Sequence, residues 1–295
     1  MTERADLAVN PGIWMTGWDR ARSDDVIRTI VQAGIDRVVV GIRDPHRFVA
    51  DGIREEVDAA GLGIVANTNQ VAHEDVSSDD REVRIRGMAR LRRALAHAHA
   101  LGADQLTGVL YSPLGKAGGP VSDRVRARTA RLIGELADEA AELGIRVTCE
   151  VVNRYETAML TTARAALDFV ERSGSERLGI HLDLFHMNIE EDDIVEAIAL
   201  ALPRLGYLEI EQNHRGELRA GHLPVLDILT GVFELGYRGR FGLEAFTVSA
   251  LAPEHATVLA VWRDVLEAQT GIAADARRLL DQARARSRVD DAPNA

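Results

Sequence analysis

Cysteine and long apolar runs are scarce in this 295-residue sequence, and each scarcity excludes a class of protein. Cys149 is the only cysteine, so no disulfide can form within the chain, which suits a reducing compartment. The longest apolar stretches have the length of a strand, well short of the ~20 residues that a membrane-spanning helix needs. The first residues of the chain are polar and lack the apolar core of a secretion signal. We therefore expect a cytoplasmic protein that is not embedded in a membrane.

Basic residues are fewer than acidic residues, 35 against 46. The formal net charge is −11, and Lys116 is the only lysine. A surface of this sign repels nucleic acid, because affinity for a phosphate backbone depends on neutralising it with lysine and arginine. We expect no nucleic-acid partner. The arginines that follow Ala273 are interpreted as part of a solvated terminal helix; they are Arg277, Arg278, Arg284 and Arg286.

No stretch rich in proline, glycine or serine divides the chain. Hydrophobic residues make up 46% and charged residues 27% of the sequence, which is enough for a large core. Barrels built of alternating strands and helices commonly occupy ~250 residues as one unit. We predict a single domain over residues 1–295, with an extra C-terminal helix and a flexible tail from about residue 288.

A helical segment that ends at a glycine and is followed by an apolar run recurs along the chain. Glycine just past a helix end adopts the left-handed conformation at little cost, and the chain then turns into a strand. Continuous apolar runs suit parallel strands that are covered by helices on the outside. The predicted strands are Leu7–Asn10, Asp36–Gly41, Gly63–Asn67, Gln105–Leu110, Ile145–Val151, Leu178–Asp183, Tyr207–Glu211 and Arg240–Ala245. Eight such units predict a (β/α)8 TIM barrel.

Acidic residues stand near the carboxyl ends of the last four predicted strands, where barrels of this kind place their chemistry. They are Glu150, Asp183, Glu209 and Glu244, and successive acids are about one βα unit apart. Four buried carboxylates would repel one another and lose their hydration unless a cation compensated them. Carboxylate oxygens suit hard divalent ions such as Mg²⁺ and Mn²⁺. The pattern therefore predicts a metal site with these four ligands rather than acids scattered over surface loops.

Three stretches of the sequence resemble a known family. They are Glu150-Val-Val-Asn-Arg-Tyr-Glu156, the run from His181 to Glu191, and Leu-Glu-Ala-Phe ending at Phe246. They look like the ketose 3-epimerases, the D-tagatose/D-allulose 3-epimerase group of the xylose-isomerase-like TIM barrels. The resemblance runs from the first strand to Phe246.

The resemblance implies metal ligation by Glu150, Asp183 and Glu244. It also implies that Glu156, His186 and Arg215 contact a small sugar substrate, and that the protein is a homo-oligomer, either a dimer or a tetramer.

Position 209 departs from the family pattern. The resemblance places a histidine there as the third metal ligand, within the pattern His-x-Gly-Glu-x-Asn-Arg. This chain has Glu209-Ile-Glu-Gln-Asn-His-Arg215, in which only the arginine is unchanged. Glu209 can still ligate, which would favour a hard ion over zinc, and His214 is the alternative ligand. We expect Mn²⁺, with Mg²⁺ or Co²⁺ as alternatives.

The acids and the resemblance together predict a metal-dependent sugar epimerase. Inverting a carbon beside a carbonyl needs a base on one face and an acid on the other, and Glu150 and Glu244 are the candidates. Trp14 and Trp18 follow the first strand, where either a substrate wall or core packing would suit them.

Other activities share the same predicted site. An aldose–ketose isomerase, or a lyase acting on a keto-sugar conjugate such as a C-glycoside, would use the same metal-assisted proton removal. An endonuclease of the apurinic-site type would need more histidine ligands and a basic track, which the charge of −11 opposes. A barrel that has lost both metal and activity through the change at Glu209 is the non-catalytic alternative.

Overall fold

The computed structural model describes residues 4–266 and 271–290 of the chain. Its strands form one closed parallel barrel in which each strand pairs with its neighbours in chain order, from β1 to β8 and back to β1. The strands are β1 Leu7–Val9, β2 Arg37–Gly41, β3 Gly63–Asn67, β4 Gln105–Thr107, β5 Arg146–Glu150, β6 Leu178–Asp183, β7 Leu205–Ile210 and β8 Arg240–Leu243. The predicted TIM barrel is confirmed.

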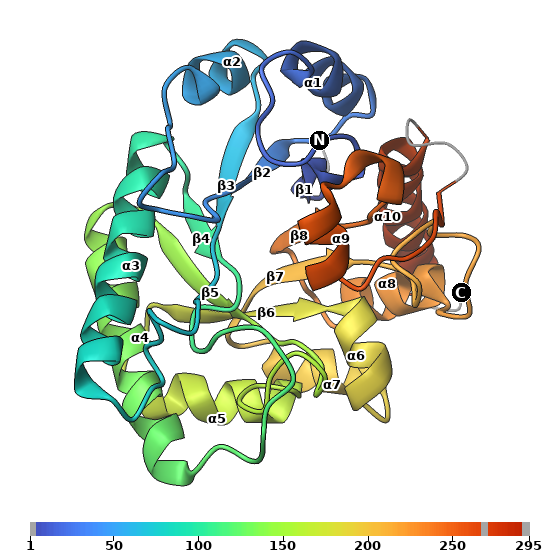
Figure 1. Cartoon of the computed structure of the whole chain (residues 1–295). Coiled ribbons are helices and arrows are strands. Elements are labelled where there is room, and N and C mark those ends of the chain that lie inside the picture. The colour runs from blue at the N-terminus through green and yellow to red at the C-terminus, as the bar shows by residue number, and fades with distance from the viewer. Residues whose placement is uncertain (1–3, 267–270, 291–295) are drawn as a thin grey trace.

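Helices lie between successive strands and surround the barrel (Figure 1). Most of them bury one face, as the apolar spacing of their sequences predicts. The α-helices are α1 Ser23–Gln32, α2 Ile53–Ala59, α3 Arg81–Ala100, α4 Asp123–Glu142, α5 Ala163–Ser173, α6 Leu184–Glu190, α7 Ile194–Ala201, α8 Val225–Glu234, α9 Pro253–Val258 and α10 Ile272–Asp290. No helix in the described ranges is both long and apolar enough to cross a membrane.

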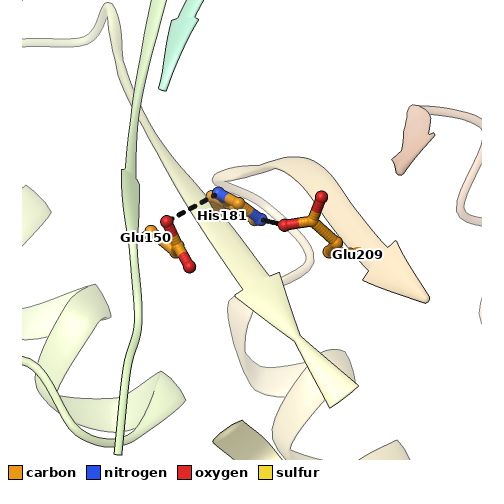
Figure 2. A group of neighbouring side chains, drawn as sticks. All are labelled: Glu150, His181 and Glu209. Atoms are coloured by element: carbon orange, nitrogen blue, oxygen red, sulfur yellow. Dashed lines mark ion pairs between the residues drawn. The ribbon is translucent and has the colours of Figure 1, made fainter. Parts of the chain in front are cut away.

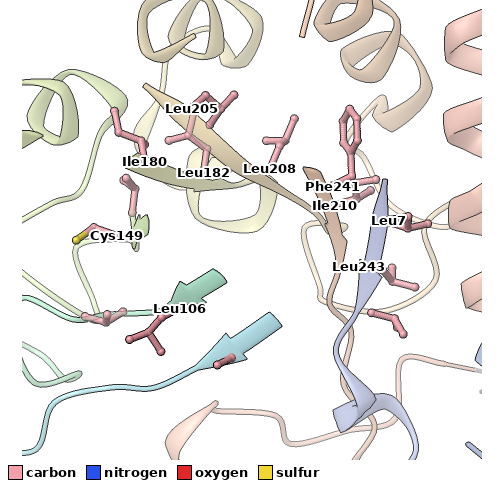
Figure 3. Close-up of a cluster of buried hydrophobic side chains, with 14 of the residues drawn as sticks. Leu7, Leu106, Cys149, Ile180, Leu182, Leu205, Leu208, Ile210, Phe241 and Leu243 are labelled. Carbon is pink, nitrogen blue, oxygen red and sulfur yellow. The ribbon is translucent and has the colours of Figure 1, made fainter. Parts of the chain in front are cut away.

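The outward-facing residues of the strands form the main hydrophobic core, between the barrel and its helices. Figure 3 shows part of this core, with Leu182, Leu208 and Phe241 on three neighbouring strands. All three side chains are buried. Because successive side chains of a strand point to opposite faces, the residues next to them in the sequence face the barrel interior.

One side of the barrel interior is apolar and the other side is polar. On the side of β1 to β3 it is filled by Ala8, Val39 and Val65, which cluster with Tyr207 apart from the main core. Side chains from β4 to β7 that share this interior include hydroxyl, imidazole and carboxyl groups. They are Thr107, Thr148, Glu150, His181, Asp183 and Glu209. Polar groups inside a barrel need partners, so this half of the interior is where we expect function.

The C-terminal helix α10 packs against α8 on the outside of the barrel (Figure 1). Its residues Ala276, Leu279 and Leu280 are buried, so the predicted solvated helix is exposed on only one side. Arg277 is also buried and pairs with Asp36 at 2.5 Å. The predicted flexible tail falls partly on residues 291–295, which lie outside the described residues.

Candidate active site

The four predicted acids stand at the same end of the barrel. Glu150 and Asp183 are the last residues of β5 and β6, Glu209 is the last but one of β7, and Glu244 directly follows β8. Asp183 is in register with Glu209, whereas Glu150 is in register with His181. The acids are therefore staggered along the sheet, because the strands of a closed barrel are tilted and offset from one another.

Despite this stagger, the acids come close enough to share an ion. Ligand atoms of Asp183, Glu209 and Glu244 lie within 4.8 Å of one another. Those of Glu150 form a second such group with Asp183 and His186, and a third with His181 and Glu209. Asp183 is fully buried, and its Oδ2 has no hydrogen-bond partner among the described residues. A buried carboxylate oxygen without a partner, surrounded by other carboxylates, suits a hard divalent cation.

The pKa values of Glu150, Asp183 and Glu209 are raised in the absence of an ion. Burial, followed by the charge of Glu244, raises the pKa of Asp183 to about 7. Burial and the neighbouring carboxylates also hold the pKa values of Glu150 and Glu209 well above their usual range. A divalent cation would favour the ionised forms and reverse these shifts.

Glu244 is held by two donors. Asn10 Nδ2, just beyond β1, donates to its Oε1 at 2.5 Å. Arg215, in the loop after β7, donates to its Oε2. The side chain therefore has a defined orientation at the mouth of the barrel before any ligand arrives.

Arg215 is the best-anchored cation of the site. Its guanidinium lies between the rings of Phe185 and Phe246, 4.5 Å and 4.6 Å from their centroids. Its Nε donates to Glu211 at 3.1 Å. Burial alone would lower the pKa of Arg215, but Glu211 and Glu244 hold it above its ordinary value. The residue has a φ of 59°, a conformation that a non-glycine residue adopts only where the surroundings enforce it.

His186, in α6, presents one ring nitrogen to the acids. The backbone N–H of Asn153 donates to its Nδ1 at 3.2 Å, so the proton of the neutral ring is assigned to Nε2. Nε2 lies 3.8 Å from Glu150 Oε1. Asn153 Nδ2 also donates to Glu156 at 3.1 Å, which joins the predicted substrate contacts His186 and Glu156 in one network.

Two buried residues of the site were missed by the sequence analysis. Glu211 pairs with Arg215, and His181 lies between Glu150 and Glu209 (Figure 2). Both stand two positions from a predicted ligand, so the period of a strand could have placed them on the same face. His214, the alternative ligand, instead contacts the backbone oxygen of Ala220 at 3.0 Å.

Glu150 and Glu244 line a cavity of about 530 Å³, which is large enough for a small sugar. Residues from several loops line it, among them Asn10, Trp18, Glu150, Glu156, His186, Arg215 and Glu244. Asp183 and Glu209 are buried away from this lining. Trp18 lines this cavity, whereas Trp14 packs in the core.

Several proteins of similar sequence and structure are sugar epimerases. The family model for the xylose isomerase-like TIM barrel matches residues 27–277. The chain is 34% identical to a ketose 3-epimerase of Arthrobacter globiformis over 253 residues, which cover 86% of this chain and 88% of that protein. It is 32% identical to an L-ribulose 3-epimerase of Methylomonas sp. (strain DH-1) over 270 residues, 92% of this chain and 94% of that protein.

Solved structures agree with the sequence comparison. The crystal structure of a D-allulose 3-epimerase from Methylomonas sp. in complex with D-allulose superimposes with a TM-score of 0.89 at 31% identity, over 95% of this chain and 98% of that one. A structure of an L-ribulose 3-epimerase gives a TM-score of 0.92 at 27% identity, over 99% of each chain.

Proposed function

Because the chain belongs to the ketose 3-epimerases of the xylose isomerase-like TIM barrel family, and is therefore an isomerase-class enzyme, we propose that it inverts the carbon next to the carbonyl of a free ketose with the help of a divalent metal ion. The observation that carries this proposal is the convergence of Asp183, Glu209 and Glu244 beside a cavity that is also lined by Glu150.

Four carboxylates would hold the ion: Glu150, Asp183, Glu209 and Glu244. Oxygen ligands of this kind favour Mn²⁺, with Mg²⁺ or Co²⁺ as alternatives. When bound, a divalent ion supplies Lewis-acid stabilisation of the negative charge that develops on the carbonyl oxygen during proton removal.

Proton transfer is assigned to Glu150 and Glu244. They come from β5 and from the residue after β8, so they stand at the two ends of the row of four acids. Inversion at carbon needs a group that removes the proton from one face and a group that returns one to the other face, and two carboxyl groups flanking the substrate meet this requirement.

The remaining polar residues of the cavity would orient the sugar. Arg215 presents a guanidinium held rigid by two aromatic rings, and His186 presents its Nε2–H. Glu156 offers a carboxylate oxygen to a sugar hydroxyl from the cavity wall. Fixed donors and acceptors of this kind hold the reacting carbon between the two glutamates.

Incubating the Mn²⁺-loaded protein with a panel of ketoses in D₂O tests the proposal. We expect the epimeric ketose, with deuterium at the inverted carbon, in the proton NMR spectrum. An aldose as the product would instead identify an aldose–ketose isomerase. Release of an aglycone from a C-glycoside, with no exchange into free ketoses, would identify a lyase.

The proposal also covers the domain number, the oligomeric state and the cellular compartment of the protein. We expect one domain that acts in the cytoplasm as a homo-oligomer, a dimer or a tetramer. Light scattering coupled to size-exclusion chromatography measures the oligomeric state directly, and a monomer would contradict this part.

A further inference from the structure

Four side chains form a hydrogen-bonded ladder inside the barrel, beneath the acids. Gln105 Nε2 donates to Thr148 Oγ1 at 2.9 Å, and Thr148 Oγ1 donates to Thr107 Oγ1 at 2.8 Å. Thr107 Oγ1 lies 2.9 Å from His181 Nδ1. All four residues are buried. We call Gln105, Thr148, Thr107 and His181 the interior ladder.

The interior ladder is anchored at the opposite end of the barrel from the acids. Arg240 Nη1 donates to Gln105 Oε1 at 2.7 Å and to Asp104 at 3.0 Å. This bond fixes which end of the Gln105 amide is the donor, and the amide in turn fixes Thr148 as an acceptor. The ladder therefore connects an ion pair at one end of the barrel to the imidazole of His181. The Thr107 hydroxyl also donates to the backbone oxygen of Thr148 at 3.3 Å, so the direction of its contact with His181 Nδ1 depends on which ring nitrogen carries the proton.

The far end of the ladder is the contact between His181 and Glu209 (Figure 2). His181 Nε2 lies 3.0 Å from Glu209 Oε2, and Nδ1 lies 4.0 Å from Glu150 Oε2. The ring of Tyr207 packs edge-on against the imidazole of His181, with 4.6 Å between the ring centroids. His181 Nε2 has no aligned hydrogen-bond partner among the described residues, so the position of the Glu209 carboxylate decides whether this buried nitrogen is satisfied.

Glu209 stands where the resemblance to the ketose 3-epimerases implies a histidine. An imidazole ligand has two side-chain torsions, whereas glutamate has three, so a glutamate needs an additional contact to keep its oxygens in place. Carboxylates that ligate metals are usually held by such a contact from a neighbouring residue.

We propose that His181 is a positioning residue that holds Glu209 against the divalent cation, so that the His181–Glu209 pair takes the place of the single histidine that the resemblance implies. The inference rests on the proposed metal site, and it concerns metal affinity rather than the sugar reaction. His181 itself is not a ligand in this proposal.

Titration of the metal-free protein with Mn²⁺, followed by the electron paramagnetic resonance signal of the free ion, measures the affinity without any substrate. His181→Leu should weaken Mn²⁺ binding by about 10- to 100-fold, the usual effect of losing a residue that orients a ligand. His97→Leu is the matched control, because His97 lies in α3, outside the barrel interior, and contacts the backbone oxygen of Pro45 at 2.9 Å. The Mn²⁺ affinity of the His97→Leu variant should equal that of the unmodified protein.

Repeating the measurement in a Glu209→His variant separates the positioning role of His181 from a role in packing the barrel interior. In Glu209→His, the ligand no longer needs a partner, so adding His181→Leu should change the affinity by no more than about twofold. Equal losses in the two backgrounds would overturn the inference.

Thr107→Val provides the same test if His181→Leu does not fold. It removes the hydroxyl that holds His181 Nδ1, and it should weaken Mn²⁺ binding, whereas Thr107→Ser should restore it. Unchanged affinity in Thr107→Val would count against the interior ladder.

Pulsed electron paramagnetic resonance of bound Mn²⁺ decides whether His181 acts indirectly. A directly coordinated ¹⁴N signal that disappears in His181→Leu would overturn the positioning role, because it would make His181 a ligand. Its absence is the expected result. A protein that binds Mn²⁺ as described but epimerises no ketose would contradict the proposed function and not this inference.

Discussion

At the scale of single residues, the two glutamates assigned to proton transfer have different surroundings. Glu244 accepts hydrogen bonds from Asn10 and Arg215. Burial raises the pKa of Glu150 well above its usual range, and the nearest histidine nitrogen is 3.8 Å away. Two carboxyl groups in unlike environments suit a division between an acid and a base.

Replacing either glutamate should stop the reaction. Glu150→Gln or Glu244→Gln keeps the shape of the side chain but cannot exchange a proton with carbon, so we expect kcat to fall by about 10²- to 10⁴-fold. Deuterium exchange into the ketose, followed by NMR at a Mn²⁺ concentration that saturates each variant, measures this loss. Glu139→Gln is the control, because Glu139 pairs with Arg92 on the outside of the barrel and should leave kcat unchanged.

Arg215 should contribute to stability as well as to substrate binding. Arg215→Met leaves Glu211 buried without its cation, so we expect a loss of about 3–5 kcal/mol in the free energy of unfolding. Urea denaturation measures this loss. The double variant Arg215→Met/Glu211→Leu removes the stranded charge and should recover much of the stability; no recovery would show that Glu211 is not the cause.

At the scale of elements, strand ends depart from the predicted bounds where the backbone meets the site. The strand predicted over Gln105–Leu110 ends at Thr107, because Gly108 has a φ of 119° and lies against the backbone of Thr68. β8 ends at Leu243 and not at Ala245, so Glu244 stands just past the strand. Apolar patterns continue through these turns, and a pattern of side chains does not report a change of backbone conformation.

Helix α10 should stabilise the barrel without affecting the site. Leu279 is buried in the main core, on the helix that packs against α8. Leu279→Ala should therefore lower the free energy of unfolding by about 2–5 kcal/mol, as large-to-small changes in a core do. Urea denaturation measures the loss, and Mn²⁺ affinity should not change. Arg278→Ala, on the exposed side of the same helix, should have little effect on either quantity.

At the scale of the whole molecule, buried acids make the metal-free protein sensitive to pH. Burial raises the pKa of Asp183 to about 7 and those of Glu150 and Glu209 well above their usual range. The unfolded chain ionises these groups near pH 4, so they stabilise the fold fully only below that pH, and the stabilisation is lost as pH rises through the folded pKa values.

The buried histidines act in the opposite direction, over a lower range of pH. Burial lowers the pKa of His181 to about 3 and that of His186 well below its usual range. Their contribution is complete above the unfolded value of about 6.5 and is lost as pH falls.

The window between pH 7.5 and 8.5 lies roughly one unit above the histidine pKa of the unfolded chain, so the histidines contribute little to a change there. The buried thiol of Cys149 acts in the same direction as the acids, because burial raises its pKa above that of the unfolded chain. We expect the melting temperature of the metal-free protein to fall across this window. Saturating Mn²⁺ should raise the melting temperature most at the upper end, because the ion binds the ionised carboxylates. Differential scanning calorimetry with and without EDTA measures both effects, and a melting temperature that rose with pH in EDTA would contradict the assignment of buried, protonated acids.

The sequence by itself determined the barrel and the position of its four acids along the chain. Regular alternation of helical and apolar segments specifies a parallel barrel, and the carboxyl ends of its strands meet at one face. Glu150, Asp183, Glu209 and Glu244 could be found in this way because each stands at or just beside a strand end.

Only the tertiary structure decided what surrounds those acids. The partners of Glu209 and Arg215, which are His181 and Glu211, depend on strand stagger and on a loop with a positive φ at Arg215. The same is true of the interior ladder, whose members come from β4, β5 and β6. Contacts between strands arise from the tilt and closure of the barrel, and a linear pattern of residues carries no measure of either.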